Sequence, residues 1–346
     1  MVYGPIYDGG KSRTAGTGDL AGYARETGER LLDDLQHAEA LSSNWADEEL
    51  GYALLSCAMD RALARLAATG CWGKDNQLAS GELWTVAGHL LDVSWLQHCA
   101  RFKPRGYAGD FEMFERFWRR ECVDHPLGKL FDRLFQGQAA VEAVRGRTEQ
   151  IGAAIAERCV TVAAERQFHL VSVGCGPALD VRCALQSLLE RQRSQLRLTL
   201  LDLDEAAVEH ARQSLTALVA PQQIHVLREN LFRLADKPRS AALLDGADML
   251  VCSGLFDYLP DEAAQKLLRL FWERLAEGGL LLIGNFAPHN PTRAYMEWIG
   301  NWYLIYRTAE ELFELGLTAG VPRSCLTLGA ERLGIDLFLA ATKSGV

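Results

Sequence analysis

The stretch FHLVSVGCGPALDVRCALQSLLERQRSQLRLTLLDLD, residues 168–204, decides the fold. Residues 170–173 are apolar or small and partly β-branched, which is typical of a strand covered on both faces. A Gly-Cys-Gly turn follows, and a helix is predicted to begin near Pro177, where a missing N–H costs nothing. The next buried strand, residues 198–201, ends at Asp202. This βαβ pattern predicts half of a doubly wound α/β fold, whose ligands bind outside the carboxyl ends of the strands.

The glycine turn distinguishes between kinds of ligand. Its run begins Gly174-Cys175-Gly176, and Leu179 stands where a dinucleotide fingerprint has its third small residue, which disfavours a pyrophosphate. The turn still lets a ligand approach the backbone closely. Asp202 can accept both hydroxyls of a ribose, so a nucleoside without phosphates fits, and S-adenosylmethionine is the common one. The alternative is a plain turn beside a solvated aspartate.

Length, composition and charge are those of a globular enzyme. Of the 346 residues, 49% are hydrophobic and 23% are charged, which are ordinary values. A formal net charge of −9 disfavours nucleic acid and anionic membranes as general partners. No apolar run approaches the ~18 residues of a membrane span, and no signal peptide is recognised. The nine cysteines are scattered without a C-x-x-C motif, which predicts reduced thiols in a cytoplasmic protein and neither a metal site nor a disulfide framework.

The first part of the chain is predicted to be helical. Residues 1–17 have no periodicity and are interpreted as an arm. Apolar residues recur at helical spacing over residues 20–67 and again over roughly 81–100. We therefore predict an arm and a helical cap or lid over residues 1–150, followed by a Rossmann-like cofactor-binding domain over residues 151–346.

Two segments near this boundary carry candidate ligand contacts. The loop at residues 103–110 places polar side chains on a flexible backbone, which makes Arg105, Tyr107 and Asp110 candidates for cofactor binding. The alternative is a tight turn with Asp110 as the helix N-cap. The arginines of Val-Arg-Gly-Arg, residues 144–147, either meet the carboxylate of the ligand or solvate their helix.

Several motifs occur in a characteristic order. They are GYAGD (106–110), AVRGR (143–147), VSVGCGPALDV (171–181), LLDLD (200–204) and SGLFDYLP (253–260). In this order the chain resembles one branch of the class I S-adenosylmethionine-dependent methyltransferases, the 3-hydroxy-fatty-acid methyl ester synthase type, over roughly residues 95–345. The resemblance implies S-adenosyl-L-methionine as the cofactor. It also implies a seven-stranded Rossmann-like sheet with a C-terminal antiparallel hairpin, for which residues 324–328 and 336–341 are candidate strands.

The resemblance assigns roles residue by residue. Gly174, Cys175 and Gly176 lie under the amino-acid end of the cofactor, and Asp202 holds the ribose. The other implied cofactor contacts are Leu203 beside the adenine, Asn230 and Leu231 after the third strand, and Ser253 and Gly254 next to the sulfonium. Many relatives carry an aspartate where this chain has Asn230, so Asn230 either binds the adenine amino group or is free for other work.

Candidate catalytic residues lie at the predicted strand ends and in the loops near them. They are Tyr107, Asn230, Ser253, Asn285 and Tyr303. Aromatic side chains after the fifth strand either form a cation–π wall for the sulfonium or are the core of an irregular segment. Methyl transfer needs mainly alignment, because the methyl carbon is already activated. No histidine-based dyad is suggested by the spacing.

Three functions remain open at the level of sequence. The first is a methyltransferase for a small molecule of secondary metabolism or signalling, with a homodimer as a possible assembly. The second follows from a similarity to the azetidine-2-carboxylate synthases. In these enzymes the amine of the cofactor attacks its own γ-carbon and releases methylthioadenosine. The third is a non-catalytic module that binds S-adenosylmethionine.

Overall fold

The computed structural model describes residues 19–162 and 166–343. Contacts within the chain divide it into two compact units. The helical unit contains the described residues up to Gly109 together with Arg119–Ala139 and His289–Tyr303. The sheet unit contains Asp110–Trp118, Ala140–Pro288 and the described residues from Leu304 onward. The expected arm lies outside the described residues, and the role of the helical unit as a lid stays a prediction.

The helical unit is built on two long antiparallel helices. Helix α1 (Leu20–Leu41) packs against α2 and α3 through buried alanine and leucine side chains. The remaining helices of this unit are α2 (Glu48–Ala67), η1 (Gly73–Asn76), α3 (Gln77–Leu91), α4 (Trp95–Phe102), α6 (Pro126–Gln136) and the π-helix η6 (Tyr295–Ile299). In the part of the chain that the structure describes, no helix is both long enough and apolar enough to cross a membrane.

The helix expected over residues 81–100 is two helices, α3 and α4, which corrects the prediction. The break falls at Ser94, whose hydroxyl accepts a hydrogen bond from the Gln97 N–H (3.0 Å) and donates one to the buried Asp132 carboxylate (2.5 Å). Serine is a preferred N-cap because its oxygen satisfies a helix N–H that has no partner within the helix. The apolar periodicity of the sequence continues across this break, so the pattern alone did not reveal it.

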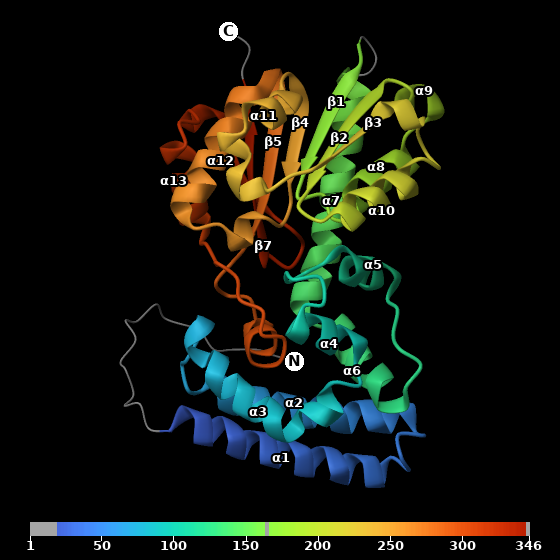
Figure 1. The fold of residues 1–346 in the computed structure, drawn as a ribbon, viewed down its shortest axis with the longest axis vertical. Coiled ribbons are helices and arrows are strands. Elements are labelled where there is room, and N and C mark those ends of the chain that lie inside the picture. Colours follow the sequence, from blue (N-terminus) through green and yellow to red (C-terminus); the bar gives the residue numbers. More distant parts are fainter. Residues whose placement is uncertain (1–18, 163–165, 344–346) are drawn as a thin grey trace. The chain divides into compact units, whose positions relative to one another are not determined.

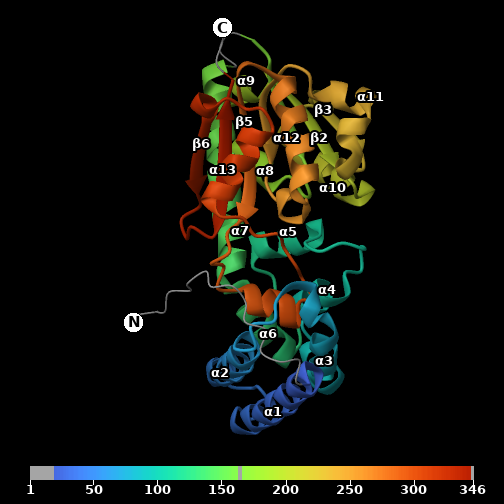
Figure 2. The same cartoon turned by 90° about the vertical axis from the view of Figure 1, so that its left-hand side faces the viewer.

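In the described residues, seven strands form one sheet in the order β3-β2-β1-β4-β5-β7-β6. The first five are parallel neighbours, and β7 pairs antiparallel with both β5 and β6. The strands are β1 (Phe168–Val173), β2 (Leu196–Asp202), β3 (Ile224–Arg228), β4 (Ala247–Cys252), β5 (Leu275–Phe286), β6 (Leu326–Ala330) and β7 (Asp336–Thr342). The predicted class, a seven-stranded sheet with a C-terminal hairpin, is confirmed, and β6 forms one edge (Figure 2).

Helices cover both faces of this sheet (Figure 1). One face packs against α12, α13 and the segment from η3 to η4, and the other against α7, α8 and α10. Alternate strand residues enter opposite cores, as the period of two in a strand requires. The helical elements of this unit are α5 (Phe111–Arg119), α7 (Ala139–Val162), α8 (Leu179–Ser187), α9 (Glu190–Arg193), α10 (Glu205–Leu215), η2 (Pro221–Gln223), η3 (Leu231–Asp236), α11 (Pro238–Ala241), η4 (Ala242–Leu244), η5 (Phe256–Tyr258), α12 (Asp261–Arg274), α13 (Ala309–Thr318) and η7 (Arg323–Cys325).

Two element boundaries differ from the sequence prediction. Helix α8 begins at Leu179 because Ala178 has a left-handed backbone (φ 51°), so the glycine turn is longer than a start at Pro177 implies. Strand β5 begins at Leu275, and Gly278 (φ 74°) lies inside the strand. The register between β4 and β5 shifts there. The double glycine at residues 278–279, where the sequence pattern predicts the end of the preceding helix, therefore forms a bulge inside β5.

Histidine 169 is buried near the amino end of β1. Its backbone N–H donates to the Asp248 carboxylate (2.8 Å), and its ring Nε2 pairs with the Thr199 hydroxyl (3.0 Å). Burial, with a smaller contribution from the nearby Arg197 cation, lowers the pKa of His169 to about 4. The ring is therefore neutral in the folded protein over a pH range in which an unfolded chain takes up a proton.

We expect the free energy of unfolding to fall as the pH is lowered through this range. The unfolded state binds more protons below an ordinary histidine pKa of ~6.5, so stability drops between there and the folded-state pKa of about 4. The expected loss is about 3 kcal/mol, measured by urea unfolding at a series of pH values. His169→Gln should show a distinctly smaller loss over the same interval. An equal loss in both proteins would contradict the assignment.

Candidate functional site

The glycine turn after β1 leaves its backbone accessible. The N–H groups of Gly174 and Cys175 both donate to the Leu201 carbonyl, at 2.8 and 3.0 Å, which holds the turn against β2. Gly176 has a φ of 49°, and no atom lies within 4 Å of the position that a Cβ would occupy there. A side chain at this position would be strained, whereas glycine leaves room for a ligand against the backbone.

Asp202 connects this turn to the end of β2. Its Oδ2 accepts a hydrogen bond from the Gly176 N–H (2.9 Å), and its Oδ1 accepts one from the Asp204 N–H (3.0 Å). Burial raises the pKa of Asp202, although these backbone donors partly oppose the rise. Each carboxylate oxygen has capacity for one more donor, so two neighbouring ligand hydroxyls can be accepted at once. This pair of acceptor oxygens fits the two hydroxyls of a ribose.

The next residues along this edge of the sheet provide an apolar platform and a fixed loop. The side chain of Leu203 is 45% exposed directly after Asp202, and Asn230 is exposed after β3. Leu231 is buried and lies 3.6 Å from the position that a Cβ on Gly174 would take. One exposed leucine directly after the Asp202 carboxylate suits the face of a purine.

Glu229 fixes the loop after β3 and was not recognised from the sequence. Its carboxylate accepts hydrogen bonds from the Asn230 N–H (2.7 Å), the Ser240 hydroxyl (2.6 Å) and the Lys237 ammonium. These contacts lower the pKa of Glu229 although its burial opposes the shift. The carboxylate therefore stays ionised and sets the position of Asn230.

Ser253 and Gly254 follow β4, as the sequence predicted. A Cβ at Gly284 on the neighbouring strand would lie 2.3 Å from the Ser253 carbonyl oxygen, so only glycine allows this approach. A Cβ on Gly254 would lie 3.3 Å from Nη2 of Arg147, which comes from α7. The turn after β4 is thus enclosed by β5 on one side and by a guanidinium on the other.

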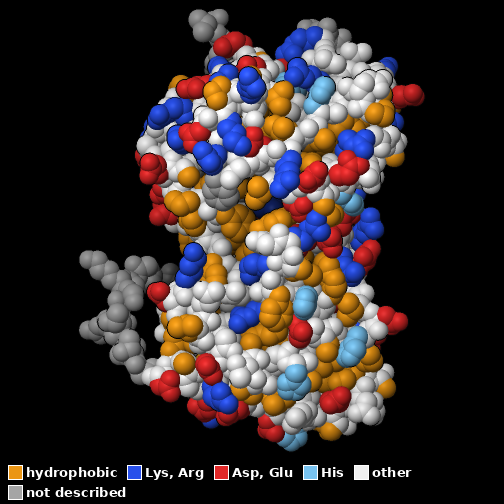
Figure 3. All heavy atoms as spheres, in the orientation of Figure 1, with side chains coloured by type: hydrophobic (Ala, Val, Ile, Leu, Met, Phe, Trp, Pro, Cys, Tyr) orange, Lys and Arg blue, Asp and Glu red, His pale blue; other side chains and the backbone are white. Residues whose placement is uncertain are grey.

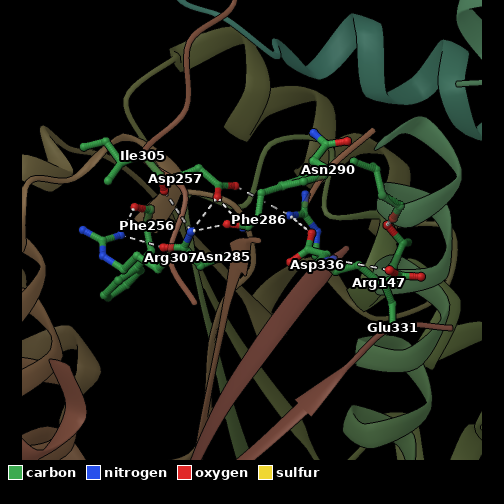
Figure 4. Close-up of polar contacts among 12 residues, drawn as sticks. Arg147, Phe256, Asp257, Asn285, Phe286, Asn290, Ile305, Arg307, Glu331 and Asp336 are labelled. Atoms are coloured by element: carbon green, nitrogen blue, oxygen red, sulfur yellow. Dashed lines mark hydrogen bonds and ion pairs between the residues drawn. The ribbon is translucent and has the colours of Figure 1, made fainter. Parts of the chain in front are cut away.

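A buried group of charges lies beside this turn (Figure 4). Nη1 of Arg147 donates to Oδ2 of Asp336 at the start of β7 (2.6 Å) and lies 4.0 Å from Oδ2 of Asp257. Burial raises the pKa of Asp257, and the nearby Asp336 raises it further. Burial also raises the pKa of Asp336 against the opposing effect of Arg147. The two carboxylates together outweigh the effect of burial on Arg147 and raise its pKa, so the guanidinium stays charged.

Arg307 connects η5, the start of α12 and the end of β5. Its guanidinium donates to the carbonyls of Phe256 (2.9 Å) and Leu259 (2.6 Å) and to Oδ1 of Asn285 (2.6 Å). The same group binds Asp261. The amide of Asn285 in turn donates to Oδ1 of Asp257 (3.2 Å). These hydrogen bonds give Asn285 a structural role at the end of β5, and its catalytic role stays a prediction.

Helix α5 packs with the sheet unit, although residues 119–139 of the helical unit separate it in sequence from the rest of the sheet unit. Asp110 caps this helix by accepting hydrogen bonds from the N–H groups of Glu112 and Met113, both at 3.0 Å. One turn later, Glu115 accepts two hydrogen bonds from Arg182 on α8 (2.8 and 3.2 Å) and lies 2.9 Å from Nε2 of His210 on α10. The N-cap interpretation of Asp110 is therefore correct, and contact with a cofactor stays a prediction.

Three predicted site residues belong to the helical unit. They are Arg105, Tyr107 and Tyr303. The Tyr303 hydroxyl donates to Oδ1 of Asn76 (2.9 Å), whose amide group binds the buried Glu297 carboxylate (3.0 Å). Burial raises the pKa of Tyr303 to about 12, so the hydroxyl keeps its proton. The other predicted site residues belong to the sheet unit.

The comparisons with known proteins agree with this fold. Residues 171–281 match a family model described as a methyltransferase domain. No curated protein matches the sequence. The fold is similar to that of a possible exported protein from Bordetella parapertussis, with 19% identity, coverage of 93% of this chain and 97% of that one, and a TM-score of 0.59. It is also similar to the CurJ carbon methyltransferase, with 12% identity, coverage of 94% and 91%, and a TM-score of 0.52.

The matched residues run from β1 to β5 and include the glycine turn, Asp202, Asn230 and Ser253. The sheet unit therefore has the fold of a class I S-adenosylmethionine-dependent methyltransferase. The match to a methyltransferase domain supports S-adenosyl-L-methionine as its cofactor. The branch suggested by the motifs stays a prediction.

We expect Asp202→Ala to weaken S-adenosylmethionine binding by about tenfold or more. The substitution removes a charged acceptor, and a hydrogen bond to such a group contributes about 1.5–3 kcal/mol. Isothermal titration calorimetry gives the affinity. Asp204→Ala is the matched control, because Asp204 accepts from the Ala206 N–H (2.9 Å) as the N-cap of α10. The control should lose about 1 kcal/mol of stability while keeping its affinity. Unchanged binding by Asp202→Ala would rule out the ribose assignment.

Arg307→Lys should destabilise the fold by about 3 kcal/mol or more, because lysine cannot reproduce the planar set of donors and leaves buried acceptors unpaired. Arg269 offers a control, since it is exposed and donates only to the Ala319 and Thr318 carbonyls. Arg269→Lys should change the stability by no more than about 0.5 kcal/mol. Denaturant unfolding measures the stability of both variants. Similar losses of stability would argue against the role of Arg307 in holding these segments together.

Proposed function

We propose that the protein is an S-adenosylmethionine-dependent methyltransferase that acts on a small molecule. The observation that carries the proposal is the Asp202 carboxylate, which accepts the Gly176 N–H at 2.9 Å. Through this contact one acidic side chain joins the open glycine turn to the end of β2. The exposed Leu203 follows immediately. A ribose acceptor, an apolar platform and an open glycine turn are the parts that an adenosyl ligand requires.

The residues of this chain would contribute binding and alignment. Bound S-adenosylmethionine supplies a methyl carbon already activated by its sulfonium, so in-line positioning accounts for most of the rate enhancement. Asp202 would orient the sugar through two hydroxyls. The Ser253 carbonyl is held by its close approach to Gly284 and would border the reacting end. A base is needed only where the acceptor arrives protonated.

Intramolecular cyclisation to azetidine-2-carboxylate ranks second among the proposals. That reaction needs the α-amino group of the cofactor as a free amine, because an ammonium has no lone pair for attack on the γ-carbon. Asp180, Asp257 and Asp336 are all buried near the turns after β1 and β4. Acidic neighbours favour the protonated form of an amine. This charge distribution supports methyl transfer over ring closure.

Incubation with S-adenosylmethionine alone, followed by mass spectrometry, tests the proposal. We expect the cofactor to persist and to yield S-adenosylhomocysteine only when an acceptor is added from a panel of small carboxylic acids, phenols and amines. Methylthioadenosine together with a cyclic amino acid, formed without an acceptor, would establish the cyclase instead. Binding without turnover on the whole panel would favour the non-catalytic module.

A further inference from the structure

Carboxyl groups outnumber cations in the buried cluster around Arg147. Asp180 on α8, Asp257 after β4 and Asp336 on β7 are 6%, 3% and 0% exposed. Arg147 bonds to Asp336 and lies within 4.0 Å of Asp257. It also interacts electrostatically with Asp180. Three buried acids therefore share one buried guanidinium, beside the two turns to which the cofactor is assigned.

The neighbouring charged groups do not balance this excess. Arg307 faces Asp257, but its guanidinium already binds Asp261. Glu331 faces Asp336, and its carboxylate accepts from the N–H groups of the hairpin that precedes β7. Burial raises the pKa of the Cys252 thiol, so Cys252 is neutral. Two guanidinium groups thus face five carboxyl groups.

One carboxylate oxygen in this cluster has no partner among the described residues, although its side chain is fully buried. Oδ1 of Asp336 accepts no hydrogen bond and lies 3.2 Å from the position of a Cβ on Gly284. That position is 2.3 Å from the Ser253 carbonyl oxygen, and Nη2 of Arg147 lies 3.3 Å from the position of a Cβ on Gly254. The unpaired oxygen and the guanidinium thus border the segment at Ser253–Gly254. An unpaired buried polar group is costly, so its retention at this place points to a ligand.

We propose that this carboxyl excess selects the charge state of the cofactor: it favours S-adenosylmethionine, which carries a sulfonium, over the neutral thioether S-adenosylhomocysteine. The inference rests on the proposed function, since it assigns the amino-acid and sulfonium end of the cofactor to this edge of the sheet. Departure of the methyl group turns the sulfonium into a thioether and removes one positive charge. The same carboxyl groups then hold the product less tightly, which promotes its release.

The proposal has a definite dependence on pH. Burial raises the pKa values of Asp257 and Asp336, and the nearby Asp336 raises that of Asp257 further, to about 8, so the unliganded cluster retains a proton near neutral pH. A cationic ligand favours the ionised carboxylates and displaces this proton. Affinity for S-adenosylmethionine should therefore rise with pH, by up to about tenfold per pH unit for each displaced proton. Affinity for S-adenosylhomocysteine should rise distinctly less.

Calorimetry on the full chain with three ligands tests this. The ligands are S-adenosylmethionine, S-adenosylhomocysteine and sinefungin, which carries an amine in place of the sulfonium. Titrations from about pH 5.5 to about pH 8.5, in buffers with different ionisation enthalpies, count the protons released. We expect release with the two cationic ligands to exceed that with the thioether, and their preference over the thioether to grow about tenfold across the range. A preference that is constant with pH, with equal release for all three, would overturn the inference and leave the cofactor assignment intact. Failure of all three to bind would overturn both.

Asp336→Asn provides the test by substitution. It removes one buried charge and should reduce the preference for S-adenosylmethionine over S-adenosylhomocysteine by about tenfold at pH ~8, mainly through weaker binding of the sulfonium. Asp248→Asn is the matched control, a buried aspartate on β4 that bonds to Arg166 and the His169 N–H. It should keep the wild-type preference. Equal preferences in Asp336→Asn and wild type, with both folded by circular dichroism, would contradict the proposal.

Discussion

The contact between Asp202 and the Gly176 N–H is the constraint on which the site depends. It connects two turns that are separated by a whole helix in sequence and become neighbours only because β1 and β2 are parallel and in register. The carboxylate satisfies the backbone of both turns and keeps capacity for a ligand. A shift of β2 by one residue would turn this side chain to the other face of the sheet. The binding chemistry therefore depends on strand register.

The charges at this edge are better explained by ligand binding than by stability. Burying an ion pair usually costs more in lost hydration than its attraction returns, and a buried carboxylate without a cation of its own costs more still. Asp180, Asp257 and Asp336 together with Arg147 are such a case. Asp248, at the amino end of β4, differs from these carboxyl groups because it binds a cation of its own, Arg166, and a backbone N–H. On the face drawn in Figure 3, acidic and basic side chains are interspersed.

The sequence predicts those parts of the fold that depend on local pattern. Buried apolar runs locate the strands of the parallel sheet, and the glycine turn followed by an acid at the end of β2 predicts a cofactor site at their carboxyl ends. Local pattern does not reveal partners that are distant in sequence. In the sequence, no feature distinguishes Arg307 from other polar residues. Only the fold shows that it binds Phe256 and Asn285. Asp336 carries a weak signal, as an acid at the start of an otherwise apolar strand, but its partner Arg147 is on a helix that precedes β1.

The division into units also shows that no single cut along the sequence separates the helical unit from the sheet unit. Helix α5 lies within the N-terminal part of the chain, yet it packs with the sheet unit, where Glu115 binds Arg182 and His210 on the helices that follow β1 and β2. Residues 289–303 follow β5, yet they pack in the helical unit, where Glu297 accepts from Asn76 and the Gly73 N–H. Removal of the first hundred and fifty residues would therefore delete a helix of the sheet unit, and it would leave residues 289–303 without the partners that bury them. Loss of activity in such a truncated protein would report damage to both units, so the function of the helical unit has to be tested by substitutions in the intact chain.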